Sequence, residues 1–156
     1  SFSHSYYLSP APPLSHYAQA IRDSLATHLF PLIDNLAIFT EPGRIVSTGA
    51  MAIIVRIIDI KSPRSIIVDG GINLIGGSQL ESQYVPVINL SRPSSSQIPL
   101  QILGSLCTPS DTFGYYCYSQ PPEIGDILII PNQGAYTYSR RQSFIKGIAP
   151  VYSLPR

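Results

Sequence analysis

Short runs of β-branched and aliphatic residues, separated by glycine, proline and serine, occupy most of the chain beyond residue 50. Runs of this length that end in turn-forming residues are typical of β-strands. We expect strands at residues 52–60, 65–69, 85–90, 98–106, 126–131 and 148–153. Because no helical pattern lies between them, the sequence predicts a mainly β fold, an antiparallel barrel or sandwich-like domain.

The residues before this region predict one helix and one strand. Between residues 15 and 30, apolar side chains recur every three or four positions, at Ala18, Ile21, Leu25 and Leu29. This is the period of an amphipathic helix, with Ser15 available as its cap and Pro31 just beyond its end. Residues 37–39 then continue as a buried strand into a turn. The order indicates the last βα unit of one domain at residues 1–44 and a separate β-domain at residues 45–156.

Composition narrows the functional classes. Only 12% of the 156 residues are charged and the formal net charge is +1, which disfavours a nucleic-acid groove. Every apolar run is shorter than the ~18 residues that a membrane helix needs. The two cysteines cannot form a disulfide framework, so we expect a reducing, cytoplasmic environment. Low charge with ten tyrosines favours a chain that buries surface against a partner.

Three segments could carry chemistry, and each has two interpretations. The first, Glu41-Pro42-Gly43-Arg44, places a carboxylate and a guanidinium on one tight turn. The two charges could hold a polar ligand, or they could form a solvated pair that stabilises the turn.

The second segment, residues 104–111, holds the thiol of Cys107 four residues before the carboxylate of Asp111. Cys107 is either a proton donor or a small packed residue beside a turn-forming aspartate. No Cys or His lies close to it in the sequence, so we expect no metal site.

The third segment joins Gly125-Asp126 to Gly134-Ala135-Tyr136. A Gly-Ala pair permits a close backbone approach, and the following tyrosine hydroxyl can donate to an oxyanion or a phosphate. The alternative is an ordinary hairpin with a tyrosine at an interface.

In this order, the segments resemble the C-terminal part of the alanine-racemase-fold (fold type III) pyridoxal-phosphate decarboxylases, the group of ornithine, diaminopimelate and arginine decarboxylases. The matching stretches are residues 41–44, 68–73 (Val-Asp-Gly-Gly-Ile-Asn), 107–111, 125–126 and 134–136, with residues 143–147 where the family has Phe-Asn-Gly. The Cys-Thr-Pro-x-Asp form is similar to the branch that acts in siderophore, antibiotic and other specialised pathways. The resemblance implies a C-terminal β-domain preceded by the last helix and strand of a (β/α)₈ barrel.

The resemblance implies pyridoxal 5'-phosphate as cofactor and assigns its contacts residue by residue. Glu41 would pair with the pyridine nitrogen and keep it protonated, so that the ring can accept electrons when carbon dioxide leaves. Arg44 and Tyr136 would bind the phosphate beside Gly43, because a guanidinium and a phenol are suitable donors.

The resemblance also implies the catalytic and substrate residues. Cys107 would reach across a dimer interface as the acid that returns a proton to the substrate carbon, and Asp111 would shape its loop. Where the family usually has a substrate-binding Arg and Tyr, this chain has Gly77 and Glu81. Thr108 stands where family members that bind the distal amine of a substrate often have an acidic residue. Its presence disfavours an unmodified diamino acid as substrate.

The family's cofactor-binding lysine, its ring-stacking histidine and its glycine-rich phosphate loop all belong to the N-terminal barrel, and neither Lys61 nor Lys146 stands at a matching place. We therefore expect one subunit or piece of a split decarboxylase, completed by an N-terminal barrel chain and paired as a dimer. Its substrate would be a small amino acid, free or carrier-bound. A non-catalytic relative that binds or regulates a partner is the main alternative, and a free-standing all-β ligand-binding module is a third.

Overall fold

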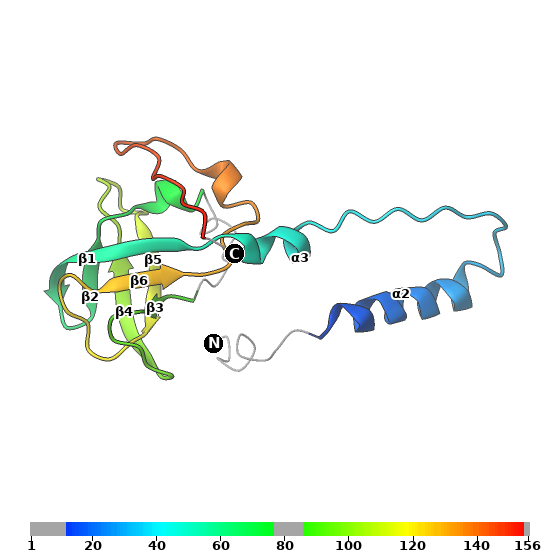
Figure 1. The fold of residues 1–156 in the computed structure, drawn as a ribbon, viewed down its shortest axis with the longest axis horizontal. Coiled ribbons are helices and arrows are strands. Elements are labelled where there is room, and N and C mark those ends of the chain that lie inside the picture. Colours follow the sequence, from blue (N-terminus) through cyan, green and yellow to red (C-terminus); the bar gives the residue numbers. More distant parts are fainter. Residues whose placement is uncertain (1–11, 77–85, 155–156) are drawn as a thin grey trace. The chain divides into compact units, whose positions relative to one another are not determined.

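The computed structural model describes residues 12–76 and 86–154, and the chain divides into two compact units after Glu41. The second unit is a closed mixed barrel in which the described strands follow the order β1-β2-β4-β5-β3-β6 (Figure 1). The strands are β1 (Ile53–Ser62), β2 (Ser65–Val68), β3 (Ile88–Asn89), β4 (Gln97–Leu103), β5 (Thr112–Tyr118) and β6 (Ile127–Ile130). The helical elements are α2 (Leu14–His28), α3 (Arg44–Ser47) and the short 3₁₀ turns η1 (Thr48–Ala50), η2 (Ile72–Leu74) and η3 (Tyr138–Arg140). The predicted mainly β fold is confirmed.

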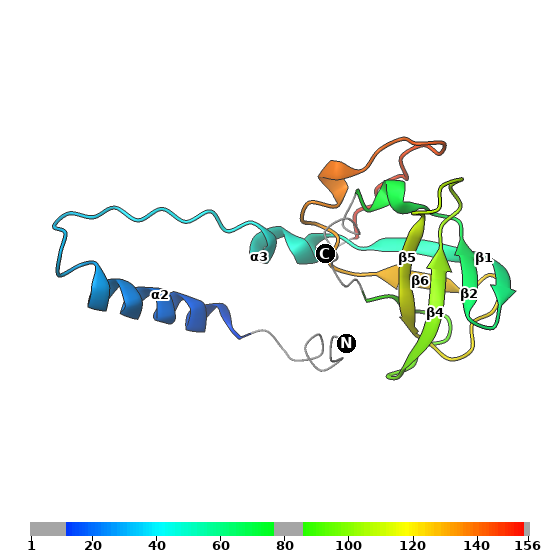
Figure 2. The same cartoon turned by 180° about the vertical axis from the view of Figure 1, so that it is seen from behind.

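The directions of the paired strands bring four connections to one end of the barrel. β1 starts where β2 and β6 end, because both pairs are antiparallel. β4 is parallel to β2 and therefore ends there too. We call this the α3 end, since α3 and η1 lead into β1 there, as seen from both sides in Figures 1 and 2. The segments that follow β2, β4 and β6 leave the barrel at the same end.

The barrel core consists of aliphatic side chains, with one phenylalanine and one cysteine. Its buried members are Val55, Ile57, Ile66, Val68, Ile75, Val87, Leu100, Ile102, Phe113, Cys117, Leu128 and Ile130. Along β1 the alternation of strand side chains directs Val55 and Ile57 inward and leaves Ile54 and Ile58 exposed. In this mostly apolar strand, only the side chains on one face therefore belong to the core.

Two expected strands are absent from the described residues, and one observed strand was not expected. Residues 148–153 form no strand and residues 37–39 form no strand, because in the described residues neither segment has a neighbouring strand to share hydrogen bonds. β5 was not predicted. Its alternation is broken at Tyr115 and Tyr116, both exposed, and its register with β4 shifts between the pairs Pro99–Tyr116 and Ile102–Gly114. This irregularity hides the period of two in the sequence.

Helix α2 begins and ends close to the predicted limits but is capped differently. Its N-cap is Pro13, with no side-chain cap hydrogen bond, so the predicted cap Ser15 lies inside the first turn instead. None of its residues is buried within this chain, and Leu14, Tyr17 and Ile21 are exposed. An amphipathic helix with an uncovered apolar face normally packs against another element. No helix in residues 12–76 and 86–154 is long and apolar enough to cross a membrane.

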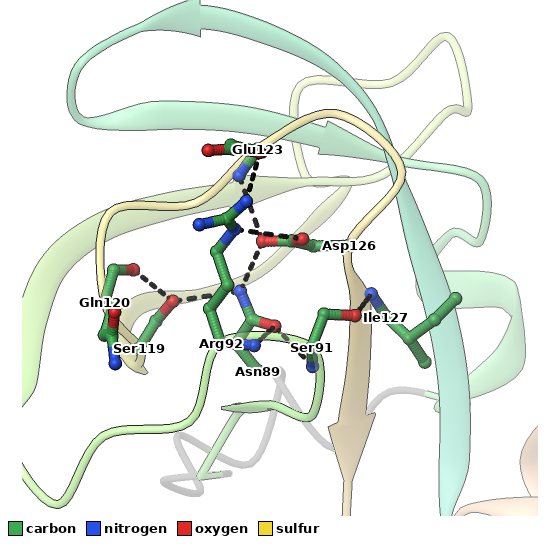
Figure 3. A network of polar contacts seen from close by, with 8 residues as sticks. All are labelled: Asn89, Ser91, Arg92, Ser119, Gln120, Glu123, Asp126 and Ile127. Atoms are coloured by element: carbon green, nitrogen blue, oxygen red, sulfur yellow. Dashed lines mark hydrogen bonds and ion pairs between the residues drawn. The ribbon is translucent and has the colours of Figure 1, made fainter.

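A buried polar network closes the barrel end opposite α3 (Figure 3). The Asn89 side chain donates to Asp126 Oδ2 at 2.8 Å and to Ser119 Oγ at 3.0 Å, and its Oδ1 accepts from the backbone N–H groups of Ser91 and Arg92. Asn89 is fully buried, and these bonds satisfy both its amide nitrogen and its amide oxygen. The Gly125-Asp126 motif therefore has a structural role.

The charge of Asp126 is stabilised within this network. Burial alone would raise the pKa of Asp126, but hydrogen bonds from Asn89 and from the Glu123 backbone N–H, with the nearby Arg92 guanidinium, together lower it. Arg92 Nε lies 3.4 Å from Asp126 Oδ1, and the same guanidinium pairs with Glu123. The ionised carboxylate is thus the form that the folded barrel holds.

We expect Asn89→Ala to lower the free energy of unfolding of the chain by about 2–3 kcal/mol, because the buried Asp126 carboxylate and two partly buried backbone N–H groups lose a partner. Urea unfolding followed by circular dichroism measures this loss. Gln120→Ala is the matched control, since this exposed amide lies in the same region and should change stability by less than about 0.5 kcal/mol. Equal stability of the two variants would contradict the structural role of Asn89.

The lowered pKa of Asp126 predicts a pH dependence. Because the folded-state pKa lies below the unfolded value of about 3.9, the stabilisation from Asp126 is complete above that pH and is lost as the pH falls through the lower folded-state pKa. Unfolding free energies of the parent chain and Asp126→Asn should therefore differ most near neutral pH and converge in acid. The exposed Asp34→Asn serves as control and should follow the parent chain at each pH.

Candidate functional site

A guanidinium and a phenol lie together at the α3 end. Arg44 is the first residue of α3, and its Cζ atom is 4.9 Å from the centroid of the Tyr136 ring. Gly43 precedes it, and a Cβ atom at Gly43 would lie only 2.6 Å from the Tyr136 hydroxyl. Any other residue at Gly43 would displace that hydroxyl. We call Gly43, Arg44 and Tyr136 the arginine–tyrosine cluster.

The backbone of the segment after β6 fixes Tyr136 beside α3. Gly134 N donates to Thr48 O at 3.0 Å, and a Cβ atom at Gly134 would lie 1.9 Å from the carbonyl oxygen of Ser47. The expected close approach at the Gly-Ala pair is therefore present, and it occurs against the end of α3. Tyr136 itself has a φ of +61°, a left-handed conformation that is uncommon for a residue with a bulky side chain. The residue is 52% exposed, so part of Tyr136 is accessible from outside the barrel.

A buried carboxylate organises the loop after β4. Asp111 Oδ1 accepts from Ile72 N at 2.7 Å, and Asp111 Oδ2 accepts from Leu106 N at 2.6 Å. A Cβ atom at Gly104 would lie 2.2 Å from the same carboxylate, so only glycine leaves room for it. Asp111 thereby joins the turn after β2 to the loop that carries Cys107.

The two cysteines have opposite environments. Cys107 is exposed on its loop, whereas Cys117 lies in the barrel core, where burial raises the pKa of its thiol to about 12. Cys117 is therefore an inert packing residue, and Cys107 is the accessible thiol of the described chain. Next to it, Thr108 is half-buried, and its hydroxyl lies 3.1 Å from that of Ser110.

The structure does not test the remaining predicted residues. Glu41 is exposed at the end of the N-terminal unit, so its role remains a prediction. Gly77 and Glu81 lie outside the described residues. No group of three His, Cys, Asp or Glu side chains that could hold a metal ion occurs in the described part of the chain.

Sequence reasoning missed one set of contacts near Cys107. Lys146 Nζ donates to Ser105 Oγ at 2.6 Å and to the carbonyl oxygen of Asp69 at 3.0 Å. The sequence alone assigns Lys146 no role, because its position does not match that of the family's cofactor-binding lysine. The signal for its actual contacts is absent from the sequence, because its partners lie 41 and 77 residues away.

Known proteins match this chain over most of its length. Residues 16–134 match the family described as pyridoxal-dependent decarboxylase, C-terminal sheet domain. The diaminopimelate decarboxylase of Helicobacter pylori is 29% identical over 146 residues, which are 90% of this chain and 34% of that protein. The diaminopimelate decarboxylase of Methanocaldococcus jannaschii is 28% identical over 107 residues, which are 67% of this chain and 24% of that protein.

Solved structures share the fold. The crystal structure of the H. pylori enzyme complexed with L-lysine has a TM-score of 0.71 at 27% identity, covering 90% of this chain and 34% of that one. The M. jannaschii enzyme in complex with L-lysine has a TM-score of 0.73 at 24% identity, covering 88% and 32%. Lysine decarboxylase from Selenomonas ruminantium has a TM-score of 0.69 at 24% identity, covering 88% and 36%.

This chain spans a quarter to a third of the curated relatives that it matches. The family match extends from within α2 to Gly134, two residues before Tyr136, and it covers all six strands of the barrel. The chain therefore belongs to the pyridoxal-dependent decarboxylase family, in which it corresponds to the C-terminal sheet domain.

Proposed function

We propose that this chain supplies the β-domain part of the active site of a pyridoxal-phosphate-dependent amino-acid decarboxylase. The observation that carries the proposal is the arginine–tyrosine cluster, a cationic fork and a phenol held beside a glycine at the α3 end of the barrel. Because the chain belongs to a pyridoxal-dependent family, the ligand that we expect at this cluster is the pyridoxal cofactor.

The cluster fits the phosphate group of the cofactor. A guanidinium offers paired N–H donors that match phosphate oxygens, and a phenol adds one O–H donor. Gly43 leaves the space next to Tyr136 Oη free of a side chain, so a phosphate oxygen can approach the hydroxyl there. Arg44 and Tyr136 thus bind the phosphate and fix the position of the cofactor ring.

Pyridoxal 5'-phosphate supplies the ring that accepts the electron pair left by departing carbon dioxide. Glu41 contributes a carboxylate that holds the proton on the pyridine nitrogen, which increases the capacity of the ring to accept those electrons. Glu41 lies three residues before Arg44 in the chain, so one short segment contributes to both the ring and the phosphate contacts.

Cys107 acts as the acid that returns a proton to the substrate carbon. Its thiol is exposed on a loop that Asp111 holds through Leu106, the residue directly before it. An acid needs a fixed position within hydrogen-bond reach of the atom that it protonates, and a loop anchored at its base provides that position. At position 108, an acidic side chain would favour a substrate with a distal amine. Thr108 instead offers the substrate a hydroxyl.

The rest of the site comes from outside this sequence. Helix α2 has an uncovered apolar face, and the relatives are about three times as long as this chain. We propose that residues 1–44 complete a (β/α)₈ barrel carried by a second chain or by a preceding segment of the same protein, and that two such assemblies pair so that Cys107 enters the partner's site. The substrate is an amino acid.

Arg44→Met should weaken the binding of pyridoxal 5'-phosphate to the assembled protein about 10- to 100-fold, because the charge-assisted hydrogen bonds to phosphate are lost. Tyr136→Phe should weaken it about fivefold, by the loss of one neutral donor. Equilibrium dialysis with the cofactor measures both constants.

Two exposed residues provide matched controls for these variants, Arg56→Met on β1 and Tyr115→Phe on β5. Both should bind the cofactor like the parent protein. If Arg44→Met binds the cofactor as tightly as the parent protein does, the arginine–tyrosine cluster does not bind the phosphate. Normal cofactor affinity in a parent protein that decarboxylates no amino acid would instead support the non-catalytic alternative.

Cys107→Ala should lower kcat for carbon dioxide release by about 10²- to 10⁴-fold while cofactor affinity stays within about twofold, because proton transfer loses its acid but the phosphate contacts remain. A steady-state assay of the assembled enzyme with amino-acid substrates gives kcat. The exposed Ser95→Ala is the control for a small deletion in a loop. Parent-like turnover in Cys107→Ala would refute the acid role.

A further inference from the structure

The C-terminal segment at residues 140–146 lies along the turn that follows β2. A Cβ atom at Gly76 would lie 2.4 Å from the carbonyl carbon of Arg140, so the two backbones touch. Gln142 N donates to the carbonyl oxygen of Asn73 at 3.0 Å, and Asn73 Nδ2 donates to Lys146 O at 3.5 Å. These contacts run along η2, the turn that Asp111 holds from its other side through Ile72 N.

Lys146 extends this contact to the loop that carries Cys107. Its ammonium donates to Ser105 Oγ at 2.6 Å and to Asp69 O at 3.0 Å. Ser105 Oγ lies 3.0 Å from Asp69 O and 3.1 Å from Gly70 O, and Ser105 N donates to Gly70 O at 2.9 Å. A hydroxyl has one proton, which goes to one of these carbonyls, and its lone pairs are then available to accept from the ammonium. The donors and acceptors are therefore matched.

The backbone next to Lys146 is in a costly conformation. Ile145 has a φ of +64°, and a β-branched residue in this region is a genuine outlier. Such conformations persist where surrounding contacts hold them, and they cluster at functional sites. The next residue, Lys146, makes contacts that can hold this conformation. Its backbone N–H donates to Phe144 O at 2.7 Å, and its side chain donates to Ser105 Oγ.

We propose that Lys146 is a positioning residue for the proton-donor loop. Its ammonium anchors Ser105, two residues before Cys107, while Asp111 anchors Leu106. The two anchors act on adjacent residues, so the backbone that leads into Cys107 is fixed from two directions. This inference rests on the proposed function of Cys107, but the anchoring itself can be measured without turnover.

The first measurement is hydrogen exchange on the whole chain. In Lys146→Met, which keeps the apolar stem and removes the donors, amides of residues 104–107 should exchange roughly fivefold faster than in the parent. Lys146→Arg should retain most of the protection, because a guanidinium can make the same two bonds. Lys61→Met, a change at the exposed lysine of β1, is the matched control and should exchange like the parent.

The second measurement is kinetic and uses the assembled enzyme. Lys146→Met should lower kcat about tenfold and leave KM within about twofold, because a displaced acid slows proton return without removing substrate contacts. Lys146→Arg should recover most of the lost kcat. A residue that only stabilised the fold would not produce this separation of kcat from KM or its recovery by arginine.

The proposal is overturned if Lys146→Met exchanges like the parent at residues 104–107, or if all six strands exchange faster to the same degree. Faster exchange confined to the loop with an unchanged kcat overturns the positioning role as well. If the assembled parent enzyme releases no carbon dioxide, the proposed function fails, whereas the exchange measurement by itself still supports or overturns the anchor.

Discussion

Closure of the sheet into a barrel is the constraint on which the other features depend. A closed barrel leaves no free strand edge, and the candidate site residues of this chain lie on the segments that enter and leave its strands. The directions of β1, β2, β4 and β6 bring four of these segments to the α3 end. Arg44, Cys107 and Tyr136 belong to three different segments there. The barrel thus gathers residues that are almost a hundred positions apart in the chain.

Buried polar groups have different roles at the two ends of the barrel. At the end opposite α3, Asn89 and Asp126 satisfy buried polar groups and close the core. At the α3 end, Asp111 satisfies two backbone N–H groups and so holds two loops together while Cys107 and Tyr136 remain exposed. Both ends use a carboxylate whose partners are hydrogen-bond donors, because an unpaired buried charge would be strongly unfavourable. One carboxylate closes a core, and the other holds the loop that carries Cys107 to the turn after β2.

Glycines set the distances at the α3 end. Gly43, Gly104 and Gly134 each face an atom that a Cβ would overlap, namely the Tyr136 hydroxyl, the Asp111 carboxylate and the Ser47 carbonyl oxygen. Such an overlap is relieved only if the facing atom moves, so each glycine sets how closely the two segments can approach.

Much of this protein was predictable from its sequence. The period of the apolar residues predicted α2, the β-branched runs predicted five of the six described strands, and the ordered motifs around Arg44, Cys107 and Tyr136 indicated the family. These signals are local, since each depends on neighbouring residues. Only the tertiary structure decided the parallel β2–β4 and β3–β5 pairs, the identity of β5, the burial of Asp111 and the contact of Lys146 with Ser105. Those features join residues that are distant in the chain, and the closed barrel determines which of them meet.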